Sequence, residues 1–363
     1  MLSVTWARRP RPRQSQRVNQ IALFDDTTPA GKGPPLAIGA QGDITYIQTT
    51  ARSALNNPAA TGMGYWSVNP YIGCAFGCAY CYARYAHRYR AERESDAPPD
   101  PLPPWLAFER RIFVKRNVAD VVRATLRHGG PRHRALVEGE WLVIGTATDP
   151  YQPAERRYRL TRSILSVLAE HPGMRIVIIT KSPLIARDID LLKRVAARGA
   201  LTVHLSLITV DRDLARRLEP RAPTPEARLR AIARVAAAGI DIGVNIMPIL
   251  PGITDDPAAL DALIARVAQT GASHVNAGSL RLRSDAQRRY LPFIETEFPH
   301  LASRYHAAYR SSYEMGDRYR AGLRRVVSRI AARHDIRFGH SGGVPDEDET
   351  ANAAAAWQLE LPV

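Results

Sequence analysis

All three cysteines of this 363-residue chain lie within eight residues, and this clustering is the strongest constraint on what the chain can fold into. Cys74, Cys78 and Cys81 follow the spacing C-x3-C-x2-C. Three thiolates on one short loop can bind three irons of a cubane iron–sulfur cluster and leave the fourth iron without a protein ligand. Gly73 and Gly77 suit a loop that folds tightly around a cofactor, because glycine tolerates unusual backbone angles and close approaches.

Two other uses of the cysteines fit the sequence less well. A structural zinc site needs a fourth Cys or His ligand, and His87, six residues after Cys81, could supply it. The chain lacks the second Cys/His pair of a zinc ribbon, however, which favours the iron–sulfur cluster. A disulfide framework is the poorest choice, because three is an odd number and a chain of this length can build a core without disulfides.

The residues around the cysteines resemble a known family. Asn69-Pro70-Tyr71 before the loop and Cys78-Ala79-Tyr80-Cys81-Tyr82 at its end are similar to the radical S-adenosylmethionine (SAM) superfamily. Within it they look most like the branch of spore photoproduct lyase and its DNA repair photolyase-like relatives, including uncharacterised bacterial proteins. The resemblance implies an enzyme with two cofactors, a [4Fe-4S] cluster bound by the three cysteines and SAM on the open iron. It also implies reductive cleavage of SAM to a 5′-deoxyadenosyl radical that abstracts hydrogen from a substrate.

Apolar runs alternate with helical patterns along the middle of the chain, which indicates an α/β fold with a parallel sheet covered on both faces. The runs that we interpret as core strands are residues 65–69, 141–146, 175–180, 201–208, 241–250 and 274–280. Helices are expected at residues 80–93, 118–126, 159–170, 184–198, 225–238 and 257–270, with an additional short strand at 112–115. The family resemblance implies a partial, six-stranded (β/α) barrel of the TIM type with the cysteine loop at its top.

The composition along the chain divides it into four segments. Residues 1–45 are rich in Pro, Gly and Arg and are expected to form a disordered basic N-terminal segment. We expect the partial barrel at 46–283, a basic helical C-terminal extension at 284–338 and a flexible acidic tail at 339–363.

Polar residues follow the second core strand and are candidates for SAM binding. Thr148, Asp149 and Glu155 lie where the superfamily uses other residues for the amino and carboxylate groups of SAM. Asp149 and Glu155 are the candidate partners of the ammonium group. For Asp149 the alternative is that Asp149-Pro150 simply begins a turn.

Two further candidates lie on the next strands. Lys181 follows the third strand and Ser206 lies in the fourth, where an unpaired polar group would be costly to bury. The resemblance places SAM contacts at such a lysine and serine; the alternative is that Ser206 pairs with the backbone and Lys181 extends to solvent. Glu219-Pro220-Arg221 could contact the ribose or form an ordinary surface loop.

Tyr80 and Tyr82, which flank the last cysteine, are the candidate catalytic residues. They could pack beside the cluster and SAM or relay a hydrogen atom, although aromatic core residues need no such role. The lyase uses a hydrogen-donor cysteine shortly before a Ser/Thr-Asp-Pro motif, whereas residues 145–149 of this chain contain no cysteine. This difference counts against repair of thymine dimers.

The formal net charge is +15, carried mostly by arginine, and attracts phosphate-bearing partners. An arginine-biased genome would give the same excess, and the charges are spread along the chain. The candidate substrate is therefore a nucleic acid, in the first place DNA as the resemblance to a repair lyase implies. RNA, a peptide or a small metabolite are the alternatives. A non-enzymatic iron–sulfur module that binds nucleic acid is a further alternative.

The remaining expectations concern partners and location. A radical SAM enzyme requires a reducing partner such as flavodoxin or ferredoxin. No run of about 18 apolar residues would span a membrane, and the N-terminus lacks the apolar region of a secretory signal. A reducing cytoplasm suits the free thiols.

Overall fold

A seven-stranded parallel sheet forms the centre of the molecule. The structure is a computed structural model and describes residues 36–58, 64–87, 100–128 and 131–339. The strand order is β11-β10-β9-β8-β7-β6-β3, and every pairing in this sheet is parallel. Because β3 and β11 are the two edges, the sheet is an open, barrel-like structure and not a closed barrel. The strands are β3 (Trp66–Val68), β6 (Trp141–Ile144), β7 (Arg175–Thr180), β8 (Ala200–Ser206), β9 (Asp241–Ile249), β10 (His274–Ser279) and β11 (Arg337–Phe338).

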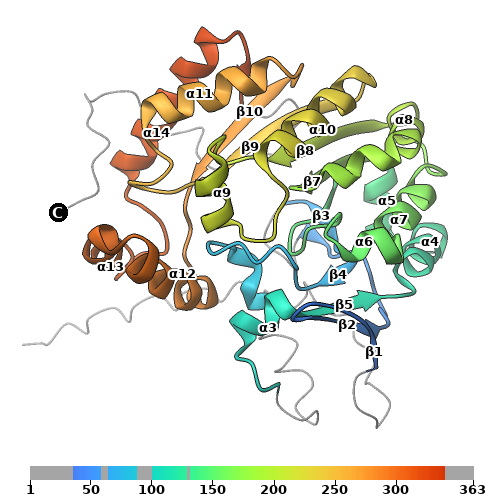
Figure 1. Ribbon diagram of the computed structural model, residues 1–363. Coiled ribbons are helices and arrows are strands. Elements are labelled where there is room, and N and C mark those ends of the chain that lie inside the picture. Colours follow the sequence, from blue (N-terminus) through green and yellow to red (C-terminus); the bar gives the residue numbers. More distant parts are fainter. Residues whose placement is uncertain (1–35, 59–63, 88–99, 129–130, 340–363) are drawn as a thin grey trace, which may run out of the picture.

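The six core strands expected from the sequence are all present, which confirms the α/β fold with a partial barrel. Their apolar runs are buried on both sides, as parallel strands covered by helices require. The helices of this part of the chain are α4 (Val118–His128), α5 (Pro131–Val137), α6 (Ala154–Tyr158), α7 (Leu160–Leu168), α8 (Ile189–Ala196), α9 (Arg212–Leu218), α10 (Pro225–Ala237) and α11 (Pro257–Ala268). In Figure 1, α11, α10, α8, α7 and α4 form an arc outside the strands, whereas α9 lies inside that arc.

Two expected helices differ from the prediction. The helix expected at 184–198 is divided into a 3-10 helix η3 (Pro183–Asp188) and α8, because Pro183 starts the segment and Asp188 is buried between arginines. In place of the helix expected at 80–93, the described residues form the 3-10 helix η2 (Tyr82–Arg84) and one further helical turn. Residues 88–93 lie outside the described part of the chain.

A second, four-stranded sheet lies beside the first and has the order β1-β2-β5-β4. Its strands are β1 (Ala37–Gln41), β2 (Ile44–Thr49), β4 (Tyr71–Ile72) and β5 (Arg111–Lys115). The helix α3 (Pro104–Arg110) directly precedes β5. β5 was expected, but the boundary of the disordered segment at residue 45 was wrong, since β1 and β2 form an antiparallel hairpin that begins at Ala37. Residues 1–35 lie outside the described residues.

The C-terminal extension is helical, as expected, and returns to the sheet at its end. It comprises α12 (Ser284–Glu297), η4 (Pro299–Leu301), α13 (Ala302–Ala308) and α14 (Asp317–Arg333). Buried tyrosines tie these helices to the barrel: the hydroxyl of Tyr305 donates to the Pro251 carbonyl (2.7 Å), and that of Tyr309 donates to the Leu280 carbonyl (3.1 Å). β11 then pairs with β10. The tail expected after residue 339 lies outside the described residues.

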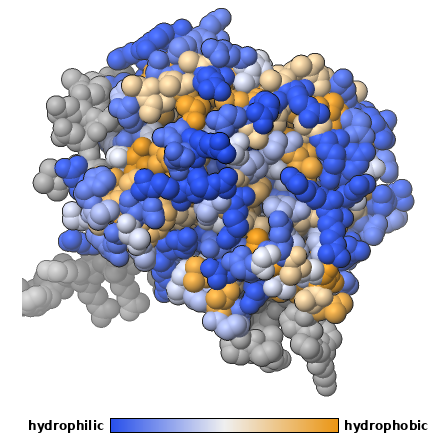
Figure 2. Space-filling view, in the orientation of Figure 1, coloured by the Kyte–Doolittle hydropathy of each residue, from blue (hydrophilic) through white to orange (hydrophobic). Residues whose placement is uncertain are grey.

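Hydrophilic residues cover most of the molecular face shown in Figure 2, with smaller hydrophobic areas between them. Among the described helices, none is both long and apolar enough to span a membrane.

Two buried histidines meet inside the sheet because the strand between them carries a glycine. His204 on β8 and His274 on β10 both align with Gly243 on β9, and their Nε2 atoms lie 3.1 Å apart. A Cβ atom at Gly243 would come within 2.2 Å of the His274 ring. The contact thus depends on the missing side chain.

We predict that Gly243→Ala destabilises the fold by about 1–3 kcal/mol, since overpacking a filled core has a cost of this size. A lower unfolding temperature in a thermal scan would report it. Gly316→Ala is the matched control, because nothing lies within 4 Å of a Cβ atom there. An unchanged melting temperature for Gly243→Ala would contradict the packing described above.

Candidate functional site

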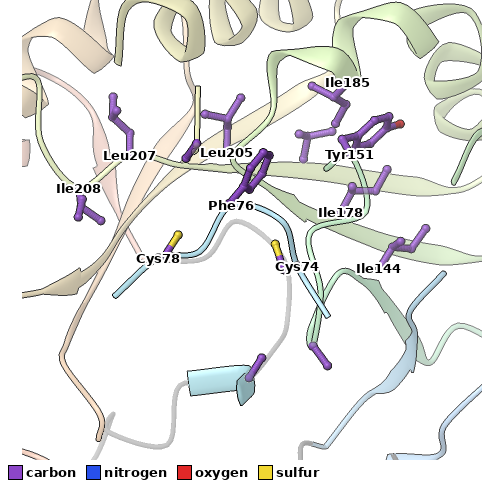
Figure 3. Packing of buried hydrophobic residues seen from close by; sticks show 14 of the residues in the cluster. Cys74, Phe76, Cys78, Ile144, Tyr151, Ile178, Ile185, Leu205, Leu207 and Ile208 are labelled. Atoms are coloured by element: carbon purple, nitrogen blue, oxygen red, sulfur yellow. The ribbon is translucent and has the colours of Figure 1, made fainter. Parts of the chain in front are cut away.

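The three cysteines lie on the loop that follows β4, at the carboxyl end of the parallel strands. Cys74 and Cys78 are buried, Cys81 is partly exposed, and none forms a disulfide. In Figure 3 the sulfur atoms of Cys74 and Cys78 lie on either side of Phe76, which belongs to the same hydrophobic cluster as Ile178 and Leu205 from β7 and β8. The loop is therefore packed onto the main sheet and carries its thiols together.

Glycines allow the loop to pass close to its neighbours. Gly73 has φ = +89°, and a Cβ atom there would lie 2.8 Å from the Phe108 carbonyl oxygen. Gly77 has φ = +65°, and a Cβ atom would lie 2.4 Å from the guanidinium of Arg221. Both positions need the left-handed backbone and the space that only glycine provides, as the sequence predicted.

Side chains from the segment after β6 hold the loop backbone. Gln152 donates from Nε2 to the Gly73 carbonyl (3.1 Å) and accepts from the Ala75 amide through Oε1 (2.9 Å). The Thr148 hydroxyl donates to the same Gly73 carbonyl (2.5 Å) and accepts from Gln152 (2.9 Å). The structure thus shows Thr148 fixing the cysteine loop; its contact with SAM stays a prediction.

Glu155, also predicted as a SAM contact, is fully buried and surrounded by protein donors. Its carboxylate accepts from the Tyr71 hydroxyl (2.5 Å), the backbone amides of Thr161 (3.0 Å) and Arg162 (3.1 Å), and Arg187 (3.1 Å). Burial raises the pKa of Glu155 and these hydrogen bonds lower it, with a net rise. In this arrangement Glu155 joins α6 and α7 to β4, and it is not brought together with the other candidates.

Asp149 connects the ends of β6 and β7. Its Oδ1 accepts from the Thr180 hydroxyl (2.7 Å) and the Tyr151 amide (2.9 Å), and its Oδ2 accepts from the Lys181 amide (2.7 Å). Burial raises the pKa of Asp149 more than these donors lower it. The turn interpretation therefore accounts for its visible contacts, and its side chain also lies close enough to Cys74 to raise the pKa of that thiol.

Lys181 lies in a buried network of charges beside Cys78. Its ammonium group is 3.4 Å from Glu219 and 5.6 Å from the centre of the Tyr80 ring. Glu219 also accepts from the Tyr80 hydroxyl and from Arg228, whose guanidinium further donates to the carbonyl of Ser206 (3.1 Å). The alternative that Lys181 extends into solvent is not observed, since its side chain is 16% exposed.

The charges in this network stabilise one another. Burial raises the pKa of Glu219, but Arg228 and Lys181 lower it to about 2, so the carboxylate stays ionised. Burial lowers the pKa of Lys181, but the negative charges near it, Glu219 first, raise the pKa by more, so that it lies above its usual value. A permanently charged lysine is thus directed toward Cys78.

A row of polar side chains crosses the sheet at the same level. Ser206, Asn245 and Asn276 are register partners on β8, β9 and β10, and all three are buried. Asn276 donates to Asn245 Oδ1 (3.1 Å), and its own Oδ1 has no hydrogen-bond partner within the described residues. A buried acceptor of this kind is available to a donor on a ligand.

Tyr82 differs from Tyr80 in its surroundings. The side chain of Tyr82 is half exposed, and its hydroxyl donates to the carbonyl of Thr146 at the end of β6. Tyr80 is buried, with its hydroxyl on Glu219.

The outer side of the cysteine loop is held by arginines. Arg84, fully buried, donates to the Cys78 carbonyl (2.7 Å) and pairs with Glu109 (2.6 Å). Arg221 donates from Nε to the Ala75 carbonyl (2.6 Å) and from Nη2 to the Glu109 carbonyl (3.2 Å). The loop carbonyls on this side are therefore bound by guanidinium groups.

The three thiols on one loop suit a cluster of several irons. In the described part of the chain, no group of three His, Cys, Asp or Glu side chains is already arranged around a single point as for one metal ion. A cubane presents a different iron to each cysteine, so its ligands need not converge on one point. His87, the alternative fourth zinc ligand, lies between Phe108 and Phe113, with Nε2 2.9 Å from the Arg111 carbonyl. Burial raises the pKa of Cys74 to about 12. A metal ion bound to the sulfur would favour the thiolate.

Four residues of the site were not recognised from the sequence: Gln152, Arg84, Glu109 and Arg228. Glu219 was considered only as a ribose contact. For Arg228 the sequence did contain a signal. Arg228 occupies a position on the apolar face of α10 between Pro225 and Leu229, and an arginine on such a face requires an internal acid.

Comparison with known proteins gives a consistent result. A sequence model described as the radical SAM superfamily matches residues 68–263. An uncharacterised protein of Mycobacterium tuberculosis (strain H37Rv) is 33% identical over 342 residues, which cover 93% of this chain and 96% of that protein. An uncharacterised protein of Methanocaldococcus jannaschii is 28% identical over 212 residues, covering 58% of this chain and 70% of that protein.

Solved structures of spore photoproduct lyase share the fold. One variant superposes with a TM-score of 0.56 at 15% identity and covers 85% of this chain and 86% of the lyase. A variant with bound AdoMet and dinucleoside spore photoproduct gives a TM-score of 0.54 at 16% identity, covering 75% of each chain.

We predict that Glu219→Gln destabilises the protein by about 3 kcal/mol, because removing one partner of a buried ion pair leaves the other charge uncompensated. Urea unfolding at pH 7 would measure the change. The matched control is Glu297→Gln, which removes an exposed pair with Arg217 and should cost less than about 1 kcal/mol. Equal effects of the two substitutions would contradict the network.

The same pair predicts a pH dependence. Because the pKa of Glu219 is lowered from 4.5 to about 2 on folding, its stabilisation is complete above pH 4.5 and is lost as the pH falls toward 2. The difference in unfolding free energy between wild type and Glu219→Gln should therefore shrink between pH 4.5 and 2. A constant difference across this range would argue against an ionised Glu219.

Proposed function

The chain belongs to the radical SAM superfamily, and from this premise we propose that Cys74, Cys78 and Cys81 hold three irons of a [4Fe-4S] cluster. Enzymes of this superfamily use such a cluster and SAM. When both are bound, the cluster supplies the electron that breaks a carbon–sulfur bond of SAM and yields a 5′-deoxyadenosyl radical. The observation that supports the proposal is one loop that carries three thiols beside the buried Lys181, directly after β7.

We assign SAM binding to side chains on the sheet side of the loop. Lys181 remains charged next to Cys78 and is suited to a carboxylate. Ser206 and the unpartnered Oδ1 of Asn276 offer an acceptor row for hydroxyl or amino groups. Thr148 and Asp149 act on SAM mainly by fixing the loop and the Lys181 backbone, and Glu155 acts further away through Tyr71.

Of the two tyrosines, Tyr82 is the better candidate for relaying a hydrogen atom. Its half-exposed ring lies at the end of β6, where a substrate can approach. Tyr80 is committed to Glu219 and, in this proposal, orients Lys181 through it.

We propose a phosphate-bearing substrate, with nucleic acid as the first candidate. The net charge of +15 favours polyanions, and the lyase whose fold this chain shares has been solved with a bound dinucleoside spore photoproduct. Reversal of a thymine dimer is not part of the proposal. All three cysteines lie on the loop, and residues 145–149 offer no thiol as a hydrogen donor.

The decisive experiment is anaerobic reconstitution with iron and sulfide, followed by addition of SAM and dithionite. We expect about four irons per chain and formation of 5′-deoxyadenosine. Cys78→Ala should lose both. Lys181→Ala should retain the iron and raise the dissociation constant for SAM about tenfold or more, as expected when a charged hydrogen bond is lost. Lys193→Ala on the exposed face of α8 is the control and should change neither.

An intact cluster that gives no 5′-deoxyadenosine would support the non-enzymatic alternative, and a single bound zinc would overturn the cluster. For the substrate, binding to duplex DNA and to RNA should weaken steeply with salt, since each phosphate contact releases counterions. An affinity that is independent of salt would exclude both nucleic acids in favour of a peptide or a small metabolite.

A further inference from the structure

Five arginines gather on the outer side of the cysteine loop, away from Lys181 and the polar row. Arg84 and Arg221 bind carbonyl groups of the loop, as described above. Arg110 ends α3, and α12 packs against α3 so that Arg288 lies 5.2 Å from the Trp105 ring. Arg289 is the next residue of α12.

This arginine cluster holds more positive than negative charge. In the described part of the chain, its carboxylate partners are Glu109 with Arg84 (2.6 Å), Asp43 with Arg110 (3.2 Å) and Asp285 with Arg288 (3.8 Å). Within the described residues, Arg289 has no carboxylate at ion-pair distance, and its Nε is buried without a hydrogen-bond partner. Burial lowers the pKa of Arg289, and the positive charges of Arg84, Arg221 and Arg110 lower it further. The carboxylate of Glu109 acts in the opposite direction and raises it.

The cluster is accessible and lies next to the thiols. The side chains of Arg110, Arg221 and Arg288 are 37%, 30% and 61% exposed. Arg221 is partly exposed and donates directly to the carbonyl of Ala75, so a molecule bound at its outer end would be separated from the loop by one side chain.

We propose that this arginine surface docks an acidic electron-donor protein of the flavodoxin type. The inference rests on the proposed function, because a cluster that initiates SAM cleavage has to be reduced. One electron leaves the reduced flavin of the donor and enters the cluster, with no bond formed between the proteins. Nucleic acid is the less favoured occupant here, since Arg84 and Arg221 are bonded to the cysteine loop on the side away from the polar row that we assign to SAM.

The test compares Arg288→Gln/Arg289→Gln with wild type, because neither residue contacts the loop. Affinity for an acidic bacterial flavodoxin is measured by calorimetry on the reconstituted protein at several salt concentrations. We expect a loss of about tenfold at low salt and a flatter salt dependence, as electrostatic steering predicts. The matched control is Arg329→Gln/Arg333→Gln on α14, which removes the same charge elsewhere and should leave the affinity unchanged.

Activity separates this inference from the proposed function. Dithionite is small and needs no docking surface, so 5′-deoxyadenosine formed with dithionite should be the same in all three proteins. With flavodoxin, NADPH and its reductase, formation should fall only in the α12 variant. If dithionite gives none in wild type, the proposed function fails while the affinity measurement still tests the docking surface. Unchanged flavodoxin affinity, or loss of duplex DNA binding instead, would overturn the inference.

Discussion

The structure depends on how the backbone carbonyl and amide groups of the cysteine loop find hydrogen-bond partners. The loop has little regular secondary structure of its own, and its buried polar groups still require partners. Gln152 meets both a carbonyl and an amide of the loop, while Arg84 and Arg221 bind further carbonyls from the other side. These contacts connect α3, the segment after β6 and the segment after α9 to one short stretch. The position of the three thiols is thus determined by elements far apart in the chain.

The charged groups around the loop lie on two sides. On the sheet side, Glu219 pairs with both Lys181 and Arg228, and all three are largely buried. On the outer side, the arginines exceed their carboxylate partners and are partly exposed. A buried group of charges suits a small bound cofactor, whereas an accessible one suits a large charged partner. The two proposals made for this chain therefore use different parts of the same site.

The sequence predicted what depends on local pattern. The six core strands are apolar runs, and Lys181 was recognised because it follows one of them. Gln152 and Glu219 were missed because their roles arise from partners about 80 and 140 residues away, which no local pattern reveals. The hairpin of β1 and β2 was missed because β1 (AIGAQ) has little apolar pattern of its own and directly follows a segment rich in Pro, Gly and Arg. Arg228 was also missed, although its position on the apolar face of α10 was a local signal for a buried acid.

The pairing of β11 with β10 has a consequence for the helices before it. The extension leaves the sheet at the end of β10 and rejoins it beside the same strand, so α12 to α14 form a loop of chain clamped at both ends. A segment fastened in this way cannot swing open about a single hinge. Any rearrangement of α12 relative to α3 would have to slide the helices between fixed ends.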